Sequence, residues 1–134
     1  HGGMDLSGHD VYLNVAGGMR VKEPAADLAV ILALASSFRE AALPGAMAAW
    51  GEVGLAGELR PVTAGDRRVS EAAALGIKGV IVPLSKNAPA SAKKPAALRM
   101  KEASTVREAL AAAFAGAPPK ATVPVRTVRV AQGA

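Results

Sequence analysis

The sequence has no cysteine, and only 3% of its residues are aromatic. Without cysteine the chain can form neither a disulfide framework nor a thiolate zinc site, which fits a reducing compartment. No apolar run approaches the roughly 20 residues that are needed to span a bilayer. The N-terminus has neither the basic region nor the apolar region of a signal peptide. We therefore expect a cytoplasmic protein that has no membrane partner.

The chain does have enough apolar sequence for one folded domain. Of its 134 residues, 51% are hydrophobic and 20% are charged, which excludes a disordered chain. The net charge of +5 and the pI near 10.0 favour an acidic partner, most commonly nucleic acid. We divide the chain into a flexible lead-in at 1–9, a domain at 10–116 with an exposed loop at 85–96, and a basic tail at 117–134. The end of that tail alternates apolar and basic residues, so it is either an edge strand or a tail without fixed structure.

The chain is organised around residues 11–38. Apolar and polar residues alternate over 11–15, which predicts a strand with one face inward. Gly17 and Gly18 then predict a turn, because glycine adopts backbone angles that are closed to other residues. Pro24 suits the first position of a helix, where its missing N–H costs nothing. Every residue from 28 to 35 is apolar, so we expect a central helix that is packed on all sides.

Two carboxylates stand at the start of this helix. Glu23 and Asp27 are four residues apart, a spacing that would suit a pair of groups for acid–base catalysis. They also complement the positive end of the helix dipole and can cap the helix. We favour the structural interpretation, in which Glu23, Pro24 and Asp27 shape the helix start.

Residues 46–62 contain two short apolar segments that are bent by three glycines, Gly51, Gly54 and Gly57. This pattern predicts a hairpin or a bulged pair of strands. Glu52 lies between apolar strand residues, so we expect it to pair with an arginine such as Arg60 or Arg20.

A helix and a buried strand follow the hairpin. Asp66 is placed to cap a helix over 67–75, and Gly76 is suited to the left-handed position that ends it. We interpret Asp66 as an N-cap rather than as a functional acid. The continuous apolar run at 77–84 is typical of a strand buried on both faces.

The last elements of the domain are a strand and a helix. Residues 97–102 are a candidate strand, and Thr105 with Glu108 forms a capping box for a helix that ends near Phe114. The order of elements is strand, helix, two strands, helix, strand, an optional strand and helix. It predicts an α/β domain with one layered core.

Linked motifs in this order resemble a known family. The residues NVAGG end the first predicted strand, EPAADLAV opens the helix, and SSFRE and GEVGLAGELRPV follow. From about Asp10 to Pro83, the chain resembles the C-terminal domain of the bacterial RadA (Sms) family of DNA-repair and recombination proteins. That domain is similar to the proteolytic domain of Lon, so the resemblance implies a Lon proteolytic-domain-like fold, also called ribosomal protein S5 domain 2-like. Its first strands would precede His1.

The same resemblance shows which catalytic residues the chain lacks. Lon-type peptidases use a serine as nucleophile and a neutral lysine as its base. In this sequence Ala26 stands at the serine position and Asp66 at the lysine position. We therefore expect no peptidase activity and no catalytic residue in this chain. The two histidines, His1 and His9, lie near the N-terminus, so we expect no metal site either.

Basic residues flank the two positions of the lost dyad. They form two groups in the sequence, which are Arg20 with Lys22, and Arg60 with Arg67 and Arg68. If the groups converge in space, they form a cationic patch that could bind DNA phosphates. The simpler interpretation is a solvated surface.

Further properties are implied by the resemblance alone. RadA proteins are ATP-dependent and process branched DNA, assemble as hexamers, and carry a zinc finger and an ATPase domain before this one. The chain would then be a scaffold and a DNA contact, with no cofactor of its own, while ATP, Mg²⁺ and zinc bind to the parent's N-terminal domains. Two alternatives remain open: a Lon-type serine peptidase with a displaced active site, and the Lon-like domain of a competence or magnesium-chelatase-like ATPase.

Overall fold

The computed structural model describes residues 2–5, 7, 8, 10–15, 17, 18, 20–85 and 95–116. Most of the predicted loop and the whole predicted tail lie outside the described residues. The described helices and strands are, in chain order, the 3₁₀ turn η1 (Pro24–Ala26), α1 (Asp27–Arg39), β1 (Met47–Ala49), β2 (Glu52–Val53), β3 (Leu59–Arg60), α2 (Gly65–Ala74), β4 (Gly79–Pro83), β5 (Arg99–Ala103) and α3 (Val106–Ala113).

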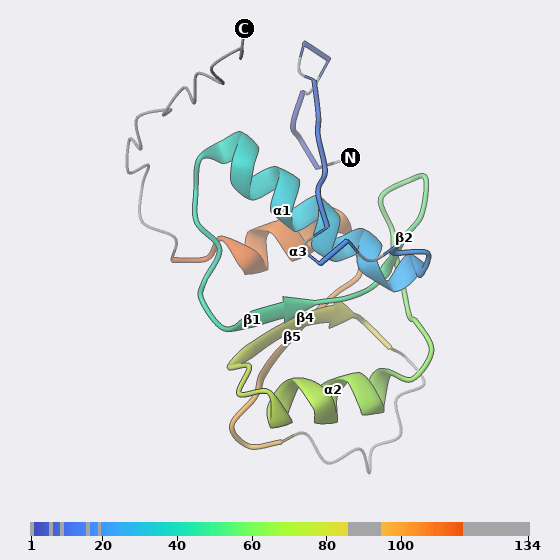
Figure 1. Ribbon diagram of the computed structural model, residues 1–134, viewed down its shortest axis with the longest axis vertical. Helices are drawn as coiled ribbons and strands as arrows, with labels where there is room; N and C mark the ends of the chain where they lie inside the picture. The colour runs from blue at the N-terminus through green and yellow to red at the C-terminus, as the bar shows by residue number, and fades with distance from the viewer. Residues whose placement is uncertain are drawn as a thin grey trace, which may run out of the picture.

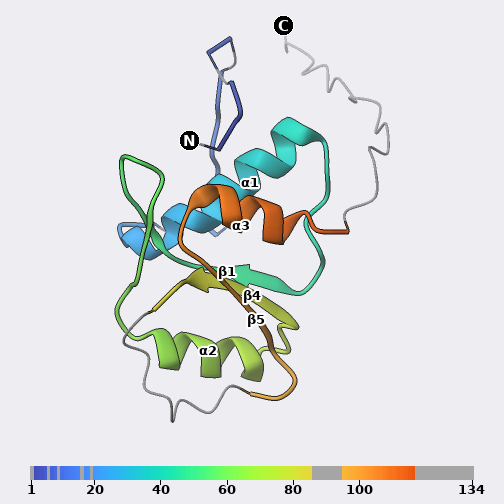
Figure 2. The same cartoon turned by 180° about the vertical axis from the view of Figure 1, so that it is seen from behind.

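Three parallel strands form the middle layer of the domain. Their order is β1-β4-β5, with Met47 opposite Gly79 and Gly79 opposite Arg99. Helices α1 and α3 cover one face of this sheet, and α2 covers the other (Figures 1 and 2). The predicted α/β layered fold is confirmed.

The central strand β4 divides the core into two clusters. Ile81 packs with Leu28 and Leu110 on the side of α1 and α3. Val80 and Val82 pack on the side of α2. Side chains alternate across a strand, so a strand between two helical layers must be apolar at every position. The sequence prediction of a strand buried on both faces is correct, although the strand is shorter than the predicted 77–84.

Helix α1 is buried along one side only. Its buried residues are Leu28, Leu32 and Ala35, which recur every three to four residues. Ala29 and Ala33 are exposed. The expectation of a helix packed on all sides is therefore wrong. Both exposed residues are alanines, and alanine is the best helix former. Each exposes only a methyl group, and single apolar side chains are common on protein surfaces.

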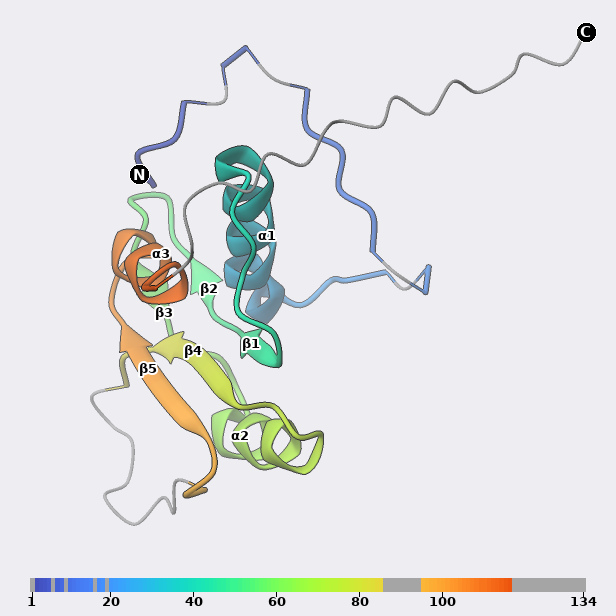
Figure 3. The same cartoon turned by 90° about the vertical axis from the view of Figure 1, so that its left-hand side faces the viewer.

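The predicted strand at 11–15 is absent from the structure. The segment has no regular structure, and the side chain of Tyr12 is 91% exposed. Figure 3 shows it as an extended trace outside the helices, beside no strand. A strand needs a partner backbone for its hydrogen bonds. No described strand lies beside this segment, so the alternating pattern has nothing to pair with. The predicted turn does form, with positive φ angles at Gly17 and Gly18.

The glycine-rich region forms a hairpin, but β1 lies outside it. Strands β2 and β3 pair antiparallel, with Glu52 opposite Arg60. The first apolar segment is not one strand, because the chain bends at Gly51 and sends β1 into the other sheet. Gly57 has a φ of 83° in the hairpin turn, and its carbonyl accepts the N–H of Val106 at 2.9 Å. The hairpin is thereby joined to the start of α3.

Helix α2 ends as predicted but begins differently. Ala64 is its N-cap residue with a φ of 58°, and no side chain caps this end. The expectation that Asp66 caps the helix is wrong, because the helix begins at Gly65, two residues earlier than predicted, and places Asp66 inside the first turn. At the other end, Gly76 has a φ of 76°, and Ile77 N–H donates to the carbonyl of Ala72 at 3.0 Å. This is a Schellman ending.

Helix α3 follows its sequence prediction closely. The Thr105 hydroxyl accepts the N–H of Glu108 at 3.2 Å, while the Glu108 carboxylate accepts the N–H of Ser104 at 2.7 Å. The buried face consists of the expected residues, which are Val106, Ala109, Leu110 and Ala113.

The close packing at Gly51 yields a first prediction, on stability. A Cβ atom at Gly51 would lie 2.7 Å from Cγ of Pro83, which belongs to the buried strand β4. Gly51→Ala should lower the free energy of unfolding by about 1–3 kcal/mol, as overpacking of a core does. Gly45→Ala is the control, because a Cβ atom there meets no atom within 4 Å. Equal thermal or urea stability of the two variants would contradict the packing argument.

Candidate functional site

The position that corresponds to the serine of Lon-type peptidases lies at the junction of η1 and α1. Ala26 ends η1 and serves as the N-cap residue of α1, and it is half-buried. Its methyl group offers no nucleophile. The preceding residue, Ala25, is 3% exposed and packs with Trp50 and Ala72. The turn is thus seated in the core on the α2 side of the sheet.

The position that corresponds to the lysine lies in the first turn of α2. Asp66 is exposed, and its carboxylate forms no hydrogen bond with any described residue. Its backbone carbonyl accepts the hydroxyl of Ser70 at 3.0 Å. An exposed carboxylate at a helix N-terminus is favoured by the helix dipole, so a structural role is sufficient to account for Asp66.

Backbone and side-chain hydrogen bonds join the start of α1 to the chain around Gly51. Gly51 N–H donates to the carbonyl of Ala25 at 2.9 Å, and Leu28 N–H donates to the carbonyl of Gly51 at 3.1 Å. The Asp27 carboxylate accepts the N–H of Val53, at the end of β2, at 3.2 Å. Asp27 therefore acts as an acceptor between elements, in addition to lying in the first turn of α1. The structural interpretation that the sequence favoured for Asp27 and Gly51 agrees with these contacts.

The two sequence groups of cations do approach each other. Glu23, next to Lys22, forms an ion pair with Arg68 of α2 across 45 positions of sequence. The Arg68 guanidinium also donates to the carbonyl of Thr63 at 3.3 Å. This brings the loop before η1 against the first turns of α2, as the sequence analysis required for a common patch.

Glutamates form ion pairs with three of the four arginines of the expected patch. Besides the pairing of Arg68, Arg67 pairs with Glu71 at 3.4 Å along α2. Arg60 pairs with two carboxylates, Glu52 at 3.3 Å and Glu58 at 2.6 Å. The expected pairing of Glu52 with Arg60 is therefore confirmed. Arg20 and Lys22 are exposed and form no ion pair with a described residue.

The Arg60 pairs also affect titration in the hairpin. The backbone N–H of Glu58 and then the guanidinium of Arg60 lower the pKa of the Glu58 carboxyl. The same carboxylate accepts the N–H of Ala56 at 3.1 Å, inside the turn. The Glu58 carboxylate raises the pKa of Arg60 in return. Both groups therefore stay charged over the physiological range of pH.

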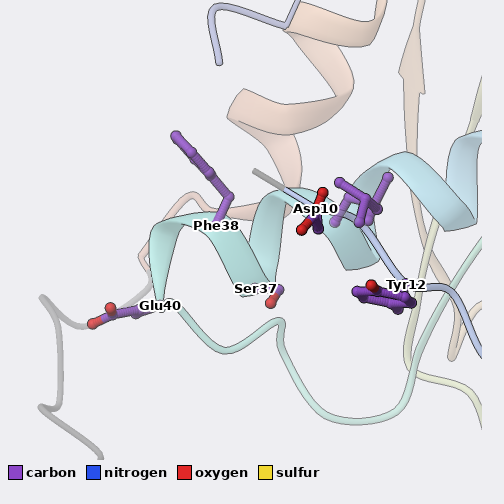
Figure 4. A pocket seen from close by; sticks show the side chains of 7 residues that line it. Asp10, Tyr12, Ser37, Phe38 and Glu40 are labelled. Carbon is purple, nitrogen blue, oxygen red and sulfur yellow. The ribbon is translucent and has the colours of Figure 1, made fainter. Parts of the chain in front are cut away.

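A hollow lies along the second half of α1, beside residues 10–12. Figure 4 shows Ser37 near the end of the helix, with Phe38 and Glu40 pointing away from it. A serine nucleophile needs a base within hydrogen-bond reach. The residues that line this hollow include carboxylates, Asp10 and Glu40, but neither lysine nor histidine. The hollow therefore offers Ser37 no amine or imidazole base from its walls.

The described part of the chain shows neither a cluster of metal ligands nor a membrane-spanning helix. No three histidine, cysteine, aspartate or glutamate side chains there gather closely enough to hold a metal ion. No helix there has both the length and the apolar character to cross a membrane.

Sequence reasoning missed the cations beside the pairing of β4 with β5. Lys78, Arg99 and Lys101 are all exposed, and no ion pair joins them to a described residue. Lys78 is about 20 positions from the other two in the sequence, and the pairing of β4 with β5 brings their backbones together. The one signal in the sequence was the order Arg99, Met100, Lys101, in which basic residues flank an apolar residue of the strand.

Comparison with known proteins agrees with the fold. Residues 4–116 match the family of the Lon protease (S16) C-terminal proteolytic domain. The chain is similar to the DNA repair protein RadA of Haemophilus influenzae, with 54% identity over 92 residues, which cover 69% of this chain and 20% of that protein. It is also similar to the DNA repair protein RadA of Escherichia coli, with 52% identity over 83 residues, 62% of this chain and 18% of that protein.

A third relative extends the match. The DNA repair protein RadA of Mycolicibacterium smegmatis is 47% identical over 107 residues, which cover 80% of this chain and 22% of that protein. The chain thus spans about a fifth of the length of these relatives. The resemblance stated from the motifs is confirmed.

The contrast between the two acids yields a prediction. Asp27→Ala removes the acceptor of the Val53 N–H and should lower the free energy of unfolding by about 1–2 kcal/mol, within the range for hydrogen bonds to charged groups. Asp66→Ala removes a similar first-turn charge that has no partner among the described residues, and should change the free energy of unfolding by about 0.5 kcal/mol or less. Urea unfolding of both variants tests this difference. A larger loss for Asp66→Ala than for Asp27→Ala would show that the helix dipole, rather than the bond to β2, dominates here.

Proposed function

The chain belongs to the family of the Lon protease C-terminal proteolytic domain, and we propose that it is a non-catalytic member that acts as the C-terminal domain of a RadA-type DNA-repair protein. In that role it serves oligomer assembly and contacts DNA during recombinational repair and branch migration. Its similarity to three proteins named DNA repair protein RadA supports this proposal. ATP, Mg²⁺ and zinc would be bound by other domains of the longer protein.

The absence of the dyad is the observation that carries the non-catalytic assignment. By resemblance, the serine and lysine positions hold Ala26 and Asp66, and neither side chain can act as nucleophile or neutral base. The packing of Ala25 and the hydrogen bonds at Gly51 favour a structural role for this turn.

Exposed apolar side chains favour the assembly role. Val11 is 48% exposed, Leu13 55% and Tyr12 91%, all in one extended segment beside α1. Exposed apolar side chains that lie next to one another commonly mark a protein–protein contact. A second copy of the chain is the partner that the ring-forming family implies.

The positive charge of the chain favours the DNA contact. The net charge of +5 attracts phosphates, and such binding depends on phosphate number rather than on base sequence. Tyr12 and Phe38 are the exposed aromatic side chains of the described part, so base stacking would contribute little and single strands would gain no strong preference.

The alternatives have less support. A peptidase with a displaced site would need a base near one of the serines, and the hollow beside Ser37 supplies no amine or imidazole base from its walls. The Lon-like domain of a competence or magnesium-chelatase-like ATPase is disfavoured by the similarity to RadA proteins.

We expect the purified chain to show no peptidase activity above a buffer blank, with casein and short peptides as substrates. Ala26→Ser combined with Asp66→Lys should also show none. Position 66 is exposed, so a lysine there would stay protonated and could not act as a base. A competent serine peptidase serves as the positive control. Proteolysis that persists through purification and disappears on mutation of one of the chain's own residues would overturn the assignment.

We also expect the chain to self-associate at concentrations of hundreds of micromolar, as measured by sedimentation. Leu13→Ser should weaken the association about tenfold or more, since burial of a leucine stabilises a contact by about 1.5–3 kcal/mol. Leu75→Ser is the matched control, because Leu75 is 79% exposed at the end of α2, away from this segment. A clean monomer at these concentrations would argue against a scaffold role for this part of the protein.

A further inference from the structure

Leu55 lies at the tip of the β2–β3 hairpin and is 99% exposed, more than any other large apolar side chain of the described residues. Its neighbours in the turn are Gly54 and Ala56, so the tip itself carries no charged side chain. Turns are usually built from small or polar residues. A single exposed leucine is common on protein surfaces, so its surroundings decide whether it has a role.

Hydrogen bonds hold the turn beneath Leu55 in one shape. Gly54 N–H donates to the carbonyl of Glu58 at 2.9 Å, and Gly57 N–H donates to the carbonyl of Gly54 at 2.9 Å. The Glu58 carboxylate is turned back onto the N–H of Ala56 at 3.1 Å. The hairpin is also joined to the start of α3, as described above. Leu55 therefore stands on a rigid support, which reduces the entropy that a contact must cost.

The hollow along the second half of α1 offers an apolar seat for such a side chain. Its lining includes Val11, Tyr12 and Leu34, and its volume is about 460 Å³. Figure 4 shows Tyr12 of the extended segment beside α1. A hollow of this size is within the range that accepts small molecules, so it is ample for one leucine side chain.

The polar groups of the tip and the hollow are also complementary. Leu55 N–H forms no hydrogen bond with a described residue. Asp10 lines the hollow, and its carboxylate likewise has no hydrogen-bond partner among the described residues. The tip thus offers a donor and the hollow an acceptor, and hydrogen bonds to a charged acceptor are the stronger kind.

Leu55 cannot reach the hollow of its own chain. The hairpin adjoins the start of α1, where the Asp27 carboxylate accepts the N–H of Val53. The same helix lines the hollow with Leu34 and Ser37, about 10–15 Å further along its axis at 1.5 Å per residue. Figures 1 and 2 show the hairpin turn and the end of α1 on opposite sides of the domain. Tip and hollow can therefore meet only when they belong to different copies of the chain.

We propose that Leu55 of one copy inserts into the hollow beside α1 of a second copy. The proposal rests on the assembly role proposed above, and it names the two surfaces that make the contact. Val11 and Tyr12 belong to the exposed segment that favours that role, so the hollow is continuous with it. Because the two surfaces differ, the contact is heterologous. Its repetition produces a ring if the rotation between copies closes, and a filament if it does not.

Sedimentation of the full chain and of two single variants tests the contact. Leu55→Ser removes the apolar tip and keeps the hollow. Val11→Asp keeps the tip and places a carboxylate in the wall of the hollow, where burial of a charge is costly. Each variant alone should associate about tenfold more weakly, or less still, than the parent chain. Leu75→Ser is the matched control, because this leucine is 79% exposed at the end of α2 and should leave association unchanged. Thermal unfolding checks that all variants remain folded.

An equimolar mixture of Leu55→Ser and Val11→Asp distinguishes this contact from a symmetric one. The first variant supplies an intact hollow and the second an intact tip. The mixture should therefore form a heterodimer that is as tight as one contact of the parent chain, and it should not grow beyond two chains. A contact in which both copies use the same patch gives no such recovery.

The proposal fails in part or whole by distinct results. If the parent chain associates and Leu55→Ser associates equally well, the tip is excluded while the assembly role stands. An effect of Leu55→Ser without one of Val11→Asp would exclude the hollow as the seat. Absence of recovery in the mixture, or an equal loss in Leu75→Ser, would also overturn the heterologous contact. If the parent chain stays monomeric at hundreds of micromolar, the assembly role itself fails along with the contact.

Discussion

The burial of β4 on both faces is the constraint on which the rest of the structure depends. Val80 and Val82 face α2, and Ile81 faces α1 and α3, so one short strand belongs to two clusters. Each helix can bury its apolar side only because this strand separates the layers. The parallel pairing of β4 with β1 and β5 then sets where every other element begins. The site positions take their geometry from this sheet.

The turn where a Lon-type peptidase carries its serine is a structural junction in this chain. Gly51 joins the carbonyl of Ala25 to the N–H of Leu28, and Asp27 accepts a hydrogen bond from the end of β2. These contacts hold η1, α1 and the hairpin together. A residue without a reactive side chain fills the position of the nucleophile, and the surrounding bonds contribute to the fold. The polar groups around this turn are therefore accounted for by the hydrogen bonds that they make within the fold.

Charge in this protein has to be considered pair by pair. Three arginines near the dyad positions, Arg60, Arg67 and Arg68, suggest a cationic patch in the sequence. In the fold each of them forms an ion pair with a glutamate. Exposed ion pairs contribute little to stability, about 0–1 kcal/mol each, yet they remove the net field that would attract a polyanion. Arg20, Lys22, Lys78 and Arg99 form no such pair with a described carboxylate. Net charge indicates the class of partner, and the distribution of ion pairs indicates the surface.

Local chemistry was readable from the sequence wherever a signal is carried by neighbouring residues. The capping box of Thr105 and Glu108, the Gly76 ending of α2 and the all-apolar β4 all depend on short spacings, and the motifs identified the family. The tertiary structure decided the features that depend on distant partners. It left 11–15 without a neighbouring strand, turned one side of α1 to solvent, split β1 from the hairpin at Gly51, and began α2 before Asp66. It also joined Glu23 to Arg68 across the fold and set Lys78 beside Arg99. The physical reason is that a strand, a buried face or an ion pair needs a partner, and a sequence pattern specifies one side of that contact while the fold supplies the other.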